Sequence, residues 1–123
     1  MDKPRALGLV RDLFFRTKID ASAEALGLDT VYASTLEAAR TRCAEGAPAL
    51  VFADLSDQNF PGAETAASIR ELAPHARLIG FASHVDLKPL KIAREAGFDL
   101  VLSRQEFSAR LPELMKTDTE KTN

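Results

Sequence analysis

The chain has 123 residues, of which 46% are hydrophobic and 28% charged, and this is the size and composition of one globular domain. A formal net charge of −2 and the lack of a polybasic stretch argue against nucleic acid and anionic membranes as partners. The single cysteine, Cys43, excludes an intramolecular disulfide, and no stretch approaches the ~18 consecutive apolar residues of a membrane span. We therefore expect a soluble, cytoplasmic protein whose partners are small molecules or other proteins.

Strands and helices are predicted to alternate along the whole chain. Five short apolar runs have the length and the flanking turn residues of strands: residues 6–10, 30–33, 49–54, 76–82 and 98–102. Apolar residues at helical spacing follow each run and predict five helices, which end near residues 26, 45, 72, 96 and 115. This alternation predicts an α/β fold, a doubly wound parallel sheet with helices on both faces.

Several helix ends carry local signals. Ser34 with Glu37 and Ser103 with Glu106 have the reciprocal capping pattern that opens a helix. Pro89 fits only in the first turn of the fourth helix, where its missing N–H costs nothing. We expect one domain over residues 1–116 and a polar, disordered tail over residues 117–123.

Asp54 ends the third and most buried of the predicted strands. In an open parallel sheet the ligand crevice lies beyond the carboxyl ends of the strands, so an acid there is a candidate site residue. The alternative is a strand-end aspartate that accepts hydrogen bonds from the following turn. Asp12, after the first strand, is a candidate N-cap of the first helix and also a candidate site residue.

From about Arg5 to Met115 the pattern resembles the receiver domain of bacterial response regulators, the phosphorelay proteins of two-component systems. The resemblance implies a flavodoxin-like fold with strand order 2-1-3-4-5. The Asp54-Leu55 pair matches the phosphoacceptor position of that family, which implies that Asp54 takes phosphate from a histidine kinase. Asp12 matches the second of two adjacent acids that hold Mg²⁺ together with the phosphoacceptor.

Three positions of this family pattern are altered. Arg11 stands in the place of the first acid, Ala82 in the place of a hydroxyl residue with Ser83 one position later, and Arg104 in the place of a lysine. Mg²⁺ prefers oxygen ligands in octahedral geometry, whereas a guanidinium pairs with carboxylates directly.

We therefore predict that Arg11 or Arg104 bridges Asp54 and Asp12 in the place of the metal, so that Mg²⁺ binding is weak or absent. The Ser83 hydroxyl is an alternative to the one missing at Ala82.

Nearby residues leave further alternatives open. Asp57 is a turn residue by its position, or else it supplies the missing acid. One ring of the Phe14-Phe15 pair suits the core, and Phe14 then covers an edge or lines the mouth of the site. His84, in the loop after the fourth strand, is expected to be solvated.

The function implied is that of a stand-alone, atypical receiver that binds a histidine kinase or a downstream protein and is not an enzyme. The fourth helix, fifth strand and fifth helix present a mixed-charge face for a partner or a homodimer: Lys88, Lys91, Arg94, Glu95, Asp99, Arg104 and Arg110. The first alternative is a working phosphorelay receiver phosphorylated on Asp54. The second is a flavodoxin-like binder of a nucleotide or flavin, against which stands the lack of a glycine-rich phosphate loop after the first strand.

Overall fold

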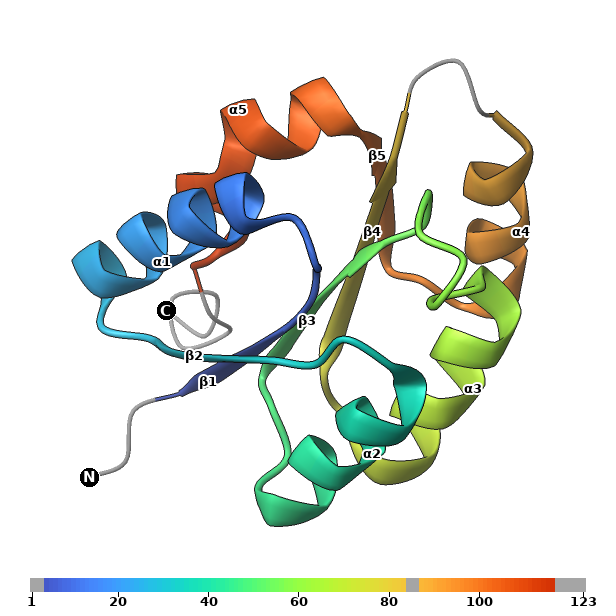
Figure 1. The fold of residues 1–123 in the computed structure, drawn as a ribbon, viewed down its shortest axis with the longest axis horizontal. Coiled ribbons are helices and arrows are strands. Elements are labelled where there is room, and N and C mark those ends of the chain that lie inside the picture. Colours follow the sequence, from blue (N-terminus) through green and yellow to red (C-terminus); the bar gives the residue numbers. More distant parts are fainter. Residues whose placement is uncertain (1–3, 84–86, 117–123) are drawn as a thin grey trace.

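A computed structural model describes residues 4–83 and 87–116, in which five strands alternate with five helices (Figure 1). In chain order these are β1 Arg5–Leu9, α1 Leu13–Leu26, β2 Asp29–Tyr32, α2 Leu36–Glu45, β3 Leu50–Asp54, α3 Gly62–Leu72, β4 Arg77–Ala82, α4 Leu87–Ala96, β5 Leu100–Ser103 and α5 Arg104–Leu114. The predicted tail, residues 117–123, and the loop with His84 lie outside the described residues. No helix in the described ranges is long and apolar enough to cross a membrane.

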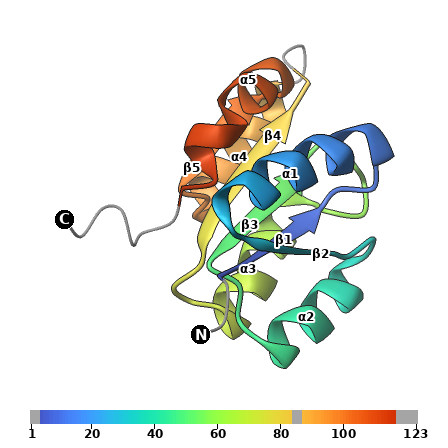
Figure 2. The ribbon, with the colours of Figure 1, turned by 90° about the vertical axis from the view of Figure 1, so that its left-hand side faces the viewer.

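The strands form one parallel sheet in the order β2-β1-β3-β4-β5, which confirms the predicted fold class and strand order. β3 lies at the centre, paired with β1 and β4, and all five of its residues are buried. Helices α1 and α5 cover one face, and α2, α3 and α4 cover the other (Figures 1 and 2). The carboxyl ends of β1 and β3 therefore meet at one edge, next to the starts of α1 and α5.

The face under α1 and α5 is packed by aromatic rings. Phe81 and Phe107 stack with ring centroids 4.1 Å apart, and Phe52 and Phe15 contact this pair at 5.3 and 5.4 Å. Fully burying a large apolar side chain contributes about 1.5–3 kcal/mol. This cluster fixes α1 and α5 against the sheet and so fixes the residues at their N-termini.

Local capping holds the start of both helices. Asp12 is the N-cap of α1, where its Oδ1 accepts the backbone N–H groups of Phe14 at 2.8 Å and Phe15 at 3.3 Å. Ser103 and Glu106 form the predicted capping box at the start of α5. The N-terminal turns of α1 and α5 are therefore well defined beside the sheet edge.

The predicted capping pair of Ser34 and Glu37 is wrong. Thr35 is the N-cap of α2, and its Oγ1 accepts the backbone N–H of Ala38 at 3.1 Å. Two hydroxyl residues stand side by side here, and the sheet places the second one at the helix start. The Ser34 hydroxyl instead accepts a hydrogen bond from Arg16 at 3.3 Å.

Candidate functional site at the carboxyl ends of the strands

Asp54 lies at the carboxyl end of the central strand and is only 7% exposed. Its Oδ1 accepts the backbone N–H of Ser56 at 3.0 Å, which is the turn interaction considered from the sequence. Its Oδ2 faces Arg104. The two interpretations of Asp54 are therefore compatible, because each uses a different carboxylate oxygen.

Arg104, at the first position of α5, lies between two carboxylates. Its Nη2 is 3.2 Å from Oδ2 of Asp12 and 4.0 Å from Oδ2 of Asp54. Its guanidinium carbon lies 4.7 Å from the centroid of the Phe15 ring, a cation–π contact that orients the group. Of the two arginines predicted to bridge the acids, Arg104 occupies that position, while Asp12 also caps α1 with its other oxygen.

Arg11 points away from this pair. Its Nη1 lies 3.6 Å from Oδ1 of Asp57, and its side chain is 53% exposed. Burial raises the pKa of the Asp57 carboxyl, but hydrogen bonds from Asn59 and the charge of Arg11 outweigh it and hold the pKa below its ordinary value. Asp57 is thus engaged by Arg11 and Asn59 and does not join Asp12 and Asp54.

The pKa of Asp54 is raised. Burial is the largest cause, and the neighbouring charges of Asp57 and Asp12 act in the same direction. The hydrogen bond from Ser56 and the charge of Arg104 lower the pKa but do not outweigh the burial. Arg104 therefore compensates part of the cost of keeping this carboxylate ionised inside the protein.

The hydroxyl position of the family pattern is filled by a methyl group. Ala82 is fully buried and lies opposite Ser103 in the sheet register. Ser83 follows it and donates its backbone N–H to Oγ of Ser56 at 3.1 Å. Ser56 thereby connects the β3–α3 loop to the end of β4, a role that the sequence signalled only by its position two residues after Asp54.

The residues at this edge do not fit a Mg²⁺ ion. Asp12 and Asp54 supply two carboxylates, but a guanidinium lies between them. Within the described part of the chain, no group of three or more histidine, cysteine or acidic side chains is placed to hold a metal. Mg²⁺ requires several oxygen ligands at near-octahedral angles, and this arrangement does not provide them.

Two residues of the predicted mixed-charge face, Arg104 and Asp99, are engaged with partners from other elements. Arg104 is turned toward the acids, and Oδ2 of Asp99 accepts hydrogen bonds from Arg70 and from the backbone N–H of Leu78, both at 2.8 Å. Asp99 thus belongs to a cluster at the amino ends of the strands. Both side chains remain partly exposed, so the mixed-charge face stays a prediction.

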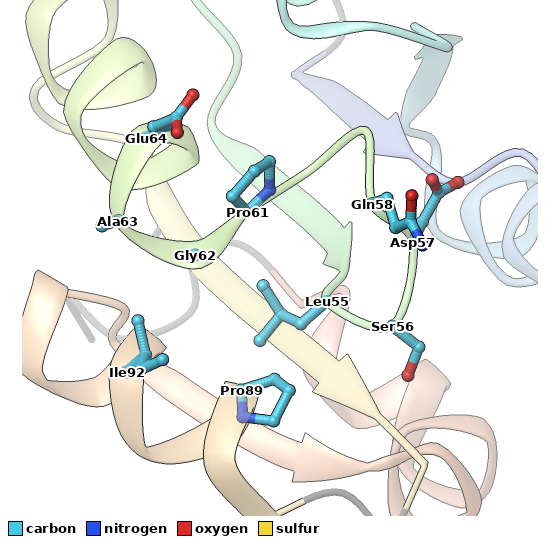
Figure 3. A pocket seen from close by; sticks show the side chains of 10 residues that line it. All are labelled: Leu55, Ser56, Asp57, Gln58, Pro61, Gly62, Ala63, Glu64, Pro89 and Ile92. Carbon is cyan, nitrogen blue, oxygen red and sulfur yellow. The ribbon is translucent and has the colours of Figure 1, made fainter.

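A groove of about 550 Å³ lies on the other side of the β3–α3 loop, between that loop and α4 (Figure 3). Its walls include the apolar side chains of Leu55, Pro61, Pro89 and Ile92, which Figure 3 shows gathered around it. Ile92 is 42% exposed. This groove lies one loop away from Asp54 and contains no part of the Arg104 cluster.

Comparison with known proteins supports the fold. No family model matches the chain, and no curated protein matches it by sequence. Solved structures of response regulators, however, match its fold. A response regulator from Burkholderia pseudomallei with a phosphorylated aspartic acid superimposes with a TM-score of 0.76 at 17% identity, over 98% of this chain and 71% of that one.

A response regulator from Thermotoga maritima gives a TM-score of 0.73 at 20% identity, over 91% of this chain and 93% of that one. NtrX from Brucella abortus, in complex with ADP, gives 0.76 at 19% identity; the match covers 89% of this chain but only 25% of that protein. At these identities the likeness shows the fold and leaves the function to be argued from the site.

Proposed function

Because the chain has the fold of response-regulator receiver domains, we propose that it is an atypical receiver that transmits signals by binding other proteins, with its Mg²⁺ and phosphate chemistry impaired. The observation that carries this proposal is the position of Arg104, whose Nη2 lies 3.2 Å from Asp12 and 4.0 Å from Asp54. A guanidinium stays protonated at all accessible pH values, so Arg104 keeps a positive charge between the two acids and permanently offsets part of their negative charge. A phosphodonor and Mg²⁺ would have to displace it.

The proposed partners are a histidine kinase or a downstream signalling protein. Exposed charged residues of α4 remain available as a docking or homodimer surface: Lys88, Lys91, Arg94 and Glu95. The protein would act in the bacterial cytoplasm as a switch or adaptor and not as an enzyme.

The test is the intact mass of the purified protein after incubation with acetyl phosphate, with and without Mg²⁺. We expect no phosphate adduct on the native protein. Arg104→Lys, which replaces the planar guanidinium by a compact ammonium, should allow a Mg²⁺-dependent adduct that is absent from Arg104→Lys combined with Asp54→Ala. Arg110→Lys is the matched control, since Arg110 lies on the same helix and pairs with Glu113; it should behave as the native protein.

The second candidate is a working phosphorelay receiver. It is favoured by the length of the Arg104–Asp54 contact, because 4.0 Å is too long for a hydrogen bond and leaves Oδ2 of Asp54 without one from any described residue. A Mg²⁺-dependent adduct on the native protein, lost in Asp54→Ala, would establish this candidate and contradict the first. If the protein were instead a nucleotide or flavin binder, the purified protein would show the absorbance of the bound nucleotide or flavin. A preparation without that absorbance would exclude this alternative.

A further inference from the structure

A second groove, of about 650 Å³, lies where α1 and α5 begin, on the side of the molecule opposite to α4. The residues that line it include Phe14, Phe15, Lys18, Ser83, Arg104 and Ser108. Its volume is within the range of about 300–1,000 Å³ that is typical of small-molecule sites. No carboxylate is among the lining residues in the described part of the chain, although Asp12 and Asp54 lie just beyond Arg104.

One wall of this groove is aromatic. Phe14 is 65% exposed although Phe15, its neighbour on α1, is buried in the core. Successive helical residues point about 100° apart, so only one of the two rings can face the sheet. The rings meet edge to face with centroids 6.0 Å apart. Lys18 Nζ lies over one side of the Phe14 ring, and the rest of the ring is exposed to solvent, so covering it with a planar partner would remove apolar surface from water.

Two cations line the groove beside this ring: Lys18, one helical turn after Phe14 on α1, and Arg104, at the start of α5. Nζ of Lys18 lies 2.7 Å from the Ser108 hydroxyl and 5.0 Å from the Phe14 ring centroid. Lys18 makes no ion pair with any of the described residues. Arg104 reaches its two acids through Nη2 alone, which leaves Nε and Nη1 without hydrogen bonds to described residues.

We propose that this groove binds a small aromatic carboxylate, whose ring lies against Phe14 and whose carboxylate is held by Lys18 and Arg104. The aromatic wall favours a planar apolar group. Lys18, which has no ion pair among the described residues, favours a negative charge, and Nε and Nη1 of Arg104 can donate hydrogen bonds to it. The volume favours a small molecule over a protein segment, which would cover a much wider surface. This binding activity goes beyond the proposed signalling role and does not depend on phosphorylation of Asp54.

The probe is 2-naphthoate, titrated into the ¹⁵N-labelled full chain and followed by backbone amide chemical shifts. We expect saturable shifts at Phe14, Lys18 and Ser108. Lys18→Met, which keeps the apolar stem and removes the charge, should weaken binding roughly tenfold, the order expected for a charge-assisted hydrogen bond. Phe14→Leu should weaken it about threefold, because it keeps apolar volume but removes the aromatic face.

Two controls make the result decisive. Ile92→Ala removes an exposed apolar side chain from the groove beside α4 and should leave the affinity unchanged. The neutral analogue 2-naphthamide should bind at least tenfold more weakly than 2-naphthoate, since it lacks the charge that Lys18 and Arg104 select. Equal binding of the two probes, an unchanged affinity in Lys18→Met, or shifts centred on Ile92 would each overturn the proposal. Shifts that do not saturate would also overturn it, because they would show that 2-naphthoate fills no defined site in the groove.

Discussion

The bridge between Arg104 and Asp54 allows a quantitative prediction. Two unit charges 4.0 Å apart attract by about 4 kcal/mol at an effective dielectric constant of about 20. Only 11% of the Asp54 side chain is exposed, but 41% of the Arg104 side chain is, so water screens the pair on one side. Exposed pairs contribute about 0–1 kcal/mol. We therefore expect a coupling free energy of about 1 kcal/mol between these two residues.

The assay is a double-mutant cycle with Asp54→Asn, Arg104→Gln and the double variant. Free energies of unfolding come from urea titrations at pH 7.5, followed by far-UV circular dichroism because the chain has no tryptophan. The control cycle uses Arg40 and Glu71, which lie 2.8 Å apart with side chains 44% and 62% exposed. Its coupling should be about 0.3 kcal/mol and should fall further in 1 M salt. A coupling for Arg104 and Asp54 no larger than that of the control pair would refute this account of the site.

Three further predictions concern stability. Burial raises the folded-state pKa of Asp54 above its unfolded value. The cost of its charge is therefore fully present above the folded pKa and absent below the unfolded value of about 3.9. Asp54→Asn should stabilise the protein at pH 7, and the gain measured by urea titration should shrink toward pH 4. A gain independent of pH would contradict this. Gly8→Ala should lower the free energy of unfolding by about 1–3 kcal/mol, because a Cβ there would lie 2.6 Å from two ring atoms of Tyr32. The double variant with Tyr32→Ala should lose less stability than the sum of the two single losses. Arg70→Met should lower the free energy of unfolding by about 1 kcal/mol at pH 7. Arg70 donates hydrogen bonds to backbone carbonyls and to Asp99, and the side chains of Arg70 and Asp99 are both partly exposed. Hydrogen bonding and the charge of Arg70 help to lower the pKa of Asp99 against the effect of burial, so this loss should shrink only as the pH falls below the ordinary carboxyl pKa of about 3.9 and through the lowered pKa of Asp99. A larger loss in acid would show that the ion pair is not responsible.

The order of the elements followed from the sequence because the signals that set it are local. The buried run that ends in Asp54 has no polar residue to place on either face, so it had to become an inner strand. Ser103 and Glu106 lie within one helical turn, and their capping box formed as predicted. The choice between Ser34 and Thr35 failed because adjacent hydroxyl residues give the same local signal, and only the sheet fixes where α2 begins.

The arrangement of charges at the site was decided by tertiary structure. Arg11 is the chain neighbour of Asp12, yet it turns to Asp57, because consecutive residues of an extended segment point to opposite sides. Arg104 is 92 residues from Asp12 and reaches it because α1 and α5 pack on the same face of the sheet, with Phe15 under the guanidinium. Lys18 and Ser108, 90 residues apart, are joined by the same packing. The sequence alone determined which groups could meet at this edge, and the packing of α1 against α5 determined which of them do, since a side chain's direction depends on what covers it.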